Sequence, residues 1–139
     1  MICRTLDEGE RFWCAGNQYT MLIPRDDTHC FEAALESVAP GASTPPNAHP
    51  TFVQMYIIVS GSARVHIGGE TRDVAAPAVA YVPLQTDHYV ENIEKTPLQY
   101  IYVSIWPGEI PHDDGRTWRE ACDAMIRMYE SRGFAPRRA

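Results

Sequence analysis

Histidine is the residue type in this chain best suited to form a site, because imidazole is the commonest neutral metal ligand and an acid or base near neutral pH. Five are present. His29 and His112 stand in polar segments, and His66 falls on the polar side of an alternating run, so we expect these three to be exposed to solvent. His49 and His88 differ, because each lies in a segment with regularly spaced glycine, proline and amide residues.

The first segment resembles the first motif of the cupin superfamily, which reads Gly, a spacer, H-x-H, three or four residues, Glu, six residues, Gly. It begins at Gly41 and ends at Gly61. His49 stands at the position of the second histidine and Asn47 at that of the first. Gln54 stands where the family usually has glutamate.

The second segment resembles the second cupin motif, P-x-G-x-x-H-x-x-x-N. Pro83, His88 and Asn92 fit this pattern, and Gln85 replaces its glycine. The spacing within both motifs is kept. The chain is therefore identified as similar to small single-domain cupins.

The resemblance implies a divalent metal ion held by His49, Gln54 and His88, with Asn47 as a fourth and poorer ligand. Glutamine keeps a carbonyl oxygen that can ligate, and some cupins that act on unsaturated uronates look similar in having Gln here. Two imidazoles and an oxygen suit Zn, Fe, Ni or Mn, and the sequence does not choose among them. The alternative is a metal-free barrel in which these residues form a polar core or a plain ligand pocket.

Neutral ligands leave the full double positive charge on the ion, so such a site favours an anionic small-molecule substrate, such as a carboxylate or an enolate. We expect a lyase, isomerase, cyclase or dehydratase step, with Tyr56 as the catalytic candidate because it shares a strand face with Gln54. An Fe(II) dioxygenase is the second hypothesis, although its usual ligand set includes a carboxylate. A binding protein without chemistry is the third. No G-x-S-x-G motif supports nucleophilic catalysis.

The elements that must position these residues are short strands. Runs rich in Val, Ile, Tyr, Phe and Thr, broken by Pro and Gly, occupy residues 18–23, 30–38, 53–59, 63–67, 73–82, 88–93 and 98–106. This rhythm is typical of an all-β sandwich or barrel with seven or eight strands. Together with the resemblance it predicts a double-stranded β-helix, the jelly-roll barrel, over about residues 18–107.

Strand alternation predicts which side chains are neighbours. Val90 and Asn92 share the face of His88, and we expect Asn92 to be structural. In residues 98–106 one face carries tyrosines, Ser104 and Trp106 and the other only Ile and Val, and the sequence leaves open which face lines the pocket. Residues 55–59 are apolar at every position, which predicts cover on both faces and therefore a homodimer.

A C-terminal helix is predicted over about residues 115–132. Apolar residues recur there at helical spacing, and Thr117 followed by Glu120 is a capping box. Gly133 is a plausible stop, and residues 136–139 are expected to fray. We expect this helix to dock on the outside of the sandwich.

Length and composition limit the remaining possibilities. The chain has 139 residues, which predicts a single domain over 1–139, and a net charge of −6, which argues against nucleic-acid and membrane-surface partners. Its four cysteines form no C-x-x-C pair. Its longest uncharged apolar run is far below the roughly 18 residues of a membrane span. We expect a soluble, cytoplasmic protein.

Overall fold

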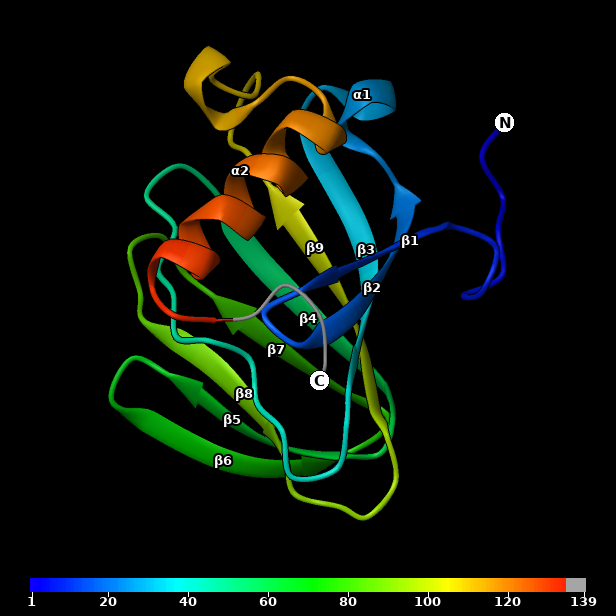
Figure 1. Cartoon of the computed structure of the whole chain (residues 1–139), viewed down its shortest axis with the longest axis vertical. Helices are drawn as coiled ribbons and strands as arrows, with labels where there is room; N and C mark the ends of the chain where they lie inside the picture. The colour runs from blue at the N-terminus through cyan, green and yellow to red at the C-terminus, as the bar shows by residue number, and fades with distance from the viewer. Residues whose placement is uncertain (135–139) are drawn as a thin grey trace.

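Two antiparallel sheets face each other in the computed structural model of the chain, in which residues 1–134 are described (Figure 1). The six-stranded sheet has the order β1-β2-β3-β9-β4-β7 and the three-stranded sheet the order β6-β5-β8. The strands are β1 Glu10–Cys14, β2 Asn17–Ile23, β3 Phe31–Val38, β4 Val53–Ser60, β5 Ser62–Ile67, β6 Glu70–Ala75, β7 Ala78–Val82, β8 His88–Asn92 and β9 Leu98–Ile105. The helical elements are α1 Arg25–Thr28, a 3₁₀ turn His112–Asp114 and α2 Trp118–Ser131. The all-β jelly roll with a C-terminal helix is confirmed.

Two elements at the N-terminal side were not predicted from the sequence. Strand β1 extends the six-stranded sheet as its edge, and its exposed Glu10 and Arg11 made the segment look unlike a strand. Residues 25–28, between the predicted runs 18–23 and 30–38, form the single helical turn α1. His29 ends this turn with φ 64°, so it does not open a strand, and β3 begins at Phe31.

The run 73–82, expected to be broken at Pro77, becomes two strands in different sheets, β6 and β7. Strand β4 then alternates cleanly across the six-stranded sheet. Gln54, Tyr56 and Ile58 point inward and are buried, whereas Met55 and Val59 point outward and are more than a third exposed. The apolar side chains of residues 55–59 therefore lie on both faces of the sheet, some in the core and some on the outer surface.

The inner face of the six-stranded sheet is more polar than its sequence indicates. On β3 the inward residues include Glu32 and Glu36, while Ala33 and Leu35 are buried on the opposite face. On β9 the tyrosines, Ser104 and the adjoining Trp106 are buried. This settles the open question about residues 98–106, because their tyrosine face is the inner one.

Helix α2 lies across the half of the six-stranded sheet that the three-stranded sheet leaves uncovered (Figure 1). Thr117 caps it, because its hydroxyl oxygen accepts from the Glu120 N–H at 3.2 Å. The Glu120 carboxylate accepts from Arg116 N instead of Thr117 N, so the capping box is only half formed. The predicted stop is confirmed, since Gly133 has φ 92° directly after the helix. Residues 136–139 lie outside the described part.

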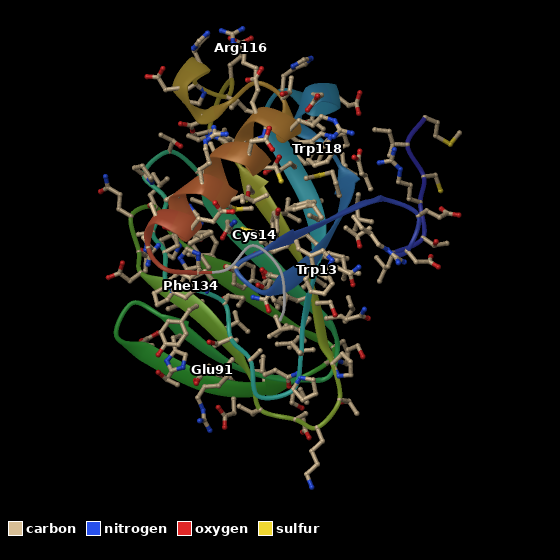
Figure 2. The ribbon with its side chains drawn as sticks, viewed as in Figure 1. Trp13, Cys14, Glu91, Arg116, Trp118 and Phe134 are labelled. Carbon is tan, nitrogen blue, oxygen red and sulfur yellow. The ribbon has the colours of Figure 1, made fainter. Side chains whose placement is uncertain are left out.

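Contacts at both ends hold α2 in this position. At the start, Asp26 accepts from Trp118 N at 2.7 Å, and the Trp118 ring lies against Phe12. At the end, the Arg132 guanidinium donates to the Pro46 carbonyl at 2.9 Å. Figure 2 shows Trp118 near the start of the helix and Phe134 just beyond its end. In residues 1–134 no helix is long and apolar enough to cross a membrane.

A buried ion pair joins the barrel to the loop that precedes α2. Arg25 donates from Nε and Nη2 to the two carboxylate oxygens of Glu32, at 2.7 and 2.6 Å, and both side chains are more than nine-tenths buried. Its Nη1 donates to the carbonyls of Asp114 and Gly115, and its guanidinium lies over Trp106. The bidentate geometry satisfies two charges that burial would otherwise make very costly.

We predict that Arg25→Met lowers the free energy of unfolding by about 3 kcal/mol, because it leaves the Glu32 charge buried without a partner. Urea denaturation followed by fluorescence measures the change. Arg64→Met is the matched control: the Arg64–Asp73 pair is exposed, so this variant should unfold close to the wild-type midpoint. Equal midpoints for Arg25→Met and wild type would contradict the prediction.

Candidate functional site

A cavity of about 650 Å³ lies between the inner face of the six-stranded sheet and helix α2. Strands β2, β3, β4 and β9 form its floor, and the segment before β4 forms part of its wall. The apolar stripe of α2 faces it, with Trp118, Met125 and Tyr129 among the lining residues. The helix is therefore part of the site, whereas it was expected to dock on the outside.

His49 and His88 come together at one end of this cavity, with their ring centroids 4.9 Å apart. His88 opens β8 and its Nδ1 lies 2.9 Å from the Thr86 carbonyl oxygen, so Nδ1 carries the proton and Nε2 is the free acceptor. His49 stacks on Phe52 at 4.3 Å. Both rings thus have fixed orientations.

Gln54 lies with them and has a fixed amide orientation. Its Nε2 donates to the Ser104 hydroxyl oxygen at 3.0 Å, and its Oε1 accepts from the Tyr56 hydroxyl at 3.1 Å. A carbonyl oxygen has two acceptor positions, so Oε1 keeps one for a further partner. The structure therefore brings together His49, His88, Gln54 and Tyr56.

Asn47 is adjacent but is used differently. Its backbone pairs with His88, through N–H to carbonyl bonds of 3.1 and 2.9 Å. Its side-chain Nδ2 donates to the Tyr129 hydroxyl of α2 at 2.8 Å, and its Oδ1 accepts from Ala48 N. Both polar ends of Asn47 are thus engaged away from the histidine pair.

Burial sets the protonation of these groups. It lowers the pKa of His49 to about 4, with the neighbouring His88 as a second cause, and it also lowers the pKa of His88. Both imidazoles are therefore neutral at pH 7, the form that binds metals. Burial, with the Glu36 charge as the next cause, holds the pKa of Tyr56 well above its usual value, so Tyr56 stays a proton donor.

The cavity also contains a carboxyl group that was not among the residues expected in the site. Glu36 is 2% exposed, and its Oε2 accepts from the Tyr100 hydroxyl at 2.5 Å. Burial raises its pKa to about 7, while hydrogen bonds from Tyr100 and Tyr19 act to lower it. The signal in the sequence was the spacing of Glu32 and Glu36, four residues apart and so on one strand face. The apolar residues between them made the opposite face look like the inner one.

The other three histidines do not join this site. His66 is half-buried instead of exposed, because it stacks on Tyr89 in the three-stranded sheet and lies 2.6 Å from the carboxylate of Glu91, which Figure 2 labels. His29 is exposed, and His112 is exposed at the rim. Among residues 1–134, no three His, Cys, Asp or Glu side chains are grouped to hold a metal ion. Within the described residues, a third side-chain donor beside the histidine pair would therefore not be an imidazole, a thiol or a carboxylate.

We predict that the His49 ring of the metal-free protein titrates near pH 4 by NMR, because burial disfavours its charged form. In the unfolded chain this residue is already protonated near its ordinary pKa of 6.5. The folded state therefore loses stability as the pH falls from about 6.5 to about 4. His49→Gln should remove that part of the pH dependence. A His49 midpoint near 6.5 would show that the ring is not buried as described.

Comparisons with known proteins agree with this architecture. A structure described as a predicted oxalate decarboxylase from Thermotoga maritima superposes with a TM-score of 0.67 and 22% identity, covering 76% of this chain and 99% of that one. The cupin domain of Schizosaccharomyces pombe Cnp3 superposes with a TM-score of 0.68 and 16% identity, covering 83% and 79%. At these identities the likeness concerns the fold.

Two curated proteins share sequence with part of the chain. An oxalate decarboxylase of Bacillus subtilis is 34% identical over 76 residues, which are 51% of this chain and 20% of that protein. A mannose-1-phosphate guanylyltransferase of Salmonella typhimurium is 34% identical over 67 residues, 48% of this chain and 14% of that protein. The chain spans a fifth or less of the length of these two relatives.

The family model for the cupin domain matches residues 34–106, which contain both motifs and all the strands from β4 to β9. This match covers more than half of the chain, and the cupin fold is the one that brings His49, Gln54 and His88 together. The chain therefore belongs to the cupin family.

Proposed function

We propose that this cupin is a metal-dependent enzyme acting on a small carboxylated or enolisable molecule, by a non-redox lyase or isomerase type of step. The observation that carries the proposal is the pair of neutral imidazoles of His49 and His88, 4.9 Å apart, with the amide oxygen of Gln54 at one end of a ligand-sized cavity.

The donor set fits a divalent ion of the Zn, Fe, Ni or Mn type. The fixed tautomer of His88 leaves Nε2 available, and Gln54 Oε1 keeps an acceptor position. Three donors leave positions open for water and substrate, as in catalytic sites. Asn47 already donates from Nδ2 to Tyr129 and accepts at Oδ1 from Ala48 N, so His49, Gln54 and His88 are the main ligands of the proposal.

An ion bound in this position would act as a Lewis acid, and it would keep its full double positive charge because all three ligands are neutral. Side chains of the protein would supply the proton and the contacts to the substrate. Tyr56 carries a proton at neutral pH next to Gln54, so its hydroxyl is the group placed to hydrogen-bond or protonate a bound substrate. The relative named as an oxalate decarboxylase supports a small carboxylate as the substrate class.

The first experiment is elemental analysis of protein purified without a histidine tag. We predict near-stoichiometric metal in wild type, alone or after incubation with Mn, Fe, Ni or Zn salts, and a loss of that metal in His88→Ala. His112→Ala is the control, since His112 is an exposed histidine outside the pair.

Metal retained equally by His88→Ala and wild type would place it elsewhere and contradict the site. If neither wild type nor variant takes up metal, the proposal is wrong and the cavity is a metal-free binding pocket. The identity of a bound metal also separates Lewis-acid chemistry from oxygen chemistry, since only a redox-active ion supports the latter.

We also propose that a second copy of the chain covers the outer face of β4, β7 and β9. Exposed apolar side chains gather there, with Met55 37%, Val79 72%, Tyr81 60% and Ile105 38% exposed. The outward residues of these three strands include no charged residue. A flat, uncharged sheet face of this kind is typical of an interface between identical subunits.

We predict that Val79→Glu converts a dimer into a monomer, because the new carboxylate would be buried in the interface without a partner. Light scattering coupled to size-exclusion chromatography measures the mass. Ile93→Glu is the matched control, since Ile93 is an exposed aliphatic residue just beyond β8. A monomeric wild-type protein, or a dimer unaffected by Val79→Glu, would overturn this arrangement.

A further inference from the structure

The cavity contains a buried acid without a cationic partner among residues 1–134. Glu36 lines the cavity and is 2% exposed. Its carboxylate accepts from Tyr100, and no basic side chain within residues 1–134 forms an ion pair with it. Arg25, the one arginine that lines the cavity within residues 1–134, already binds both oxygens of Glu32. A carboxyl group buried in this way is normally paired.

Aromatic rings from four elements surround this acid. The Glu36 charge contributes to the raised pKa of tyrosines on β2, β4, β9 and α2, which places its carboxylate near all of them: Tyr19, Tyr56, Tyr100, Tyr102 and Tyr129. The same charge raises the pKa of the Cys14 thiol on β1. These are all uncharged groups at neutral pH, so none of the described residues that face Glu36 neutralises its charge.

A carboxylate among aromatic faces is the chemistry that binds an alkylammonium group. The cation gains a charge partner, and aromatic rings attract cations through their electron-rich faces. A neutral hydroxyl or methyl group gains neither. Burial strengthens both interactions, because little water remains to screen them.

We propose that Glu36, with the tyrosines around it, is a binding site for an amine or ammonium group of the ligand that occupies this cavity. The site stands on its own and does not need a metal ion.

It also bears on the proposed function, and this part of the inference rests on that function. Glu32 lies level with Gln54 across β9, because both pair with Ser104, and Glu36 is four residues further along β3. Four strand residues span about 13 Å. The cavity would therefore receive an anionic group at His49, Gln54 and His88 and a cationic group at Glu36, as a zwitterion whose two charged groups lie far apart provides.

The test uses benzylamine and benzyl alcohol as probes, since they have nearly the same shape and differ in charge. Protein treated with EDTA is titrated with each probe, and the dissociation constant is taken from backbone NMR shifts. Because EDTA removes any metal, a failure of benzylamine to bind says nothing about the metal proposal, and the two proposals can fail separately. We expect saturable binding of benzylamine with shifts at residues around Glu36, and binding of benzyl alcohol at least tenfold weaker.

The pH dependence is a second measurement of the same contact. An ammonium binds the ionised carboxyl group, and the Glu36 pKa is about 7. Benzylamine should therefore bind about tenfold more weakly at about pH 6 than at about pH 8, while benzyl alcohol shows no such trend. The groups that face Glu36, five tyrosines and Cys14, have raised pKa values and do not titrate in this range.

Two variants test the assignment to Glu36. Glu36→Gln should weaken benzylamine binding at least tenfold and abolish its pH dependence. Tyr100→Phe removes the hydrogen bond that lowers the Glu36 pKa, so it should move the midpoint of the pH profile upward. This second variant keeps the proposal testable if Glu36→Gln does not fold.

Equal affinities for the amine and the alcohol, or no binding of benzylamine, would overturn the proposal. A pH profile of benzylamine binding whose midpoint is the same in Tyr100→Phe and in wild type would also overturn it.

Discussion

The position of helix α2 over the cavity of this cupin depends on the buried ion pair between Arg25 and Glu32. Both side chains are removed from water, which costs several kcal/mol for each charge, and the two-point contact between them offsets that cost. The third nitrogen of the guanidinium then holds the backbone at Asp114 and Gly115. Helix α2 starts only a few residues later, so its position over the barrel is set from inside the barrel.

Closure by α2 also explains the unusual protonation inside. The inner wall carries imidazoles, tyrosines and a carboxyl group where a sealed β-sandwich would carry aliphatic side chains. With the helix in place these groups lose water, and each shifts toward its neutral form: His49 and His88 downward in pKa, Glu36 and Tyr56 upward. Buried polar groups in their neutral forms respond strongly to a charge that enters with a ligand.

The sequence predicted most of the fold because turn residues punctuate nearly every strand. It also predicted the group of His49, Gln54 and His88, since the spacing within the two motifs is fixed by the strands that carry them. It did not predict which face of β3 points inward. The inner face of β3 is a cavity wall, and its acid Glu36 is stabilised by a partner far away in sequence, Tyr100. The position of α2 was missed for the same reason, because Arg25 and Asp26 fix it from about ninety residues away.

Asn47 connects the candidate metal site with the closure of the cavity. In the motif its position belongs to a histidine ligand, and in this chain its amide donates to Tyr129 near the end of α2. The amide nitrogen that makes this contact has no lone pair for an ion, so only Oδ1, which also accepts from Ala48 N, could ligate. The His-to-Asn departure from the motif therefore replaces an imidazole with a side chain that contacts the helix. Arg25 fixes the backbone just before helix α2, and Asn47 contacts Tyr129 near its end. The helix is therefore held over the cavity by one residue next to the barrel wall and by one residue of the first motif.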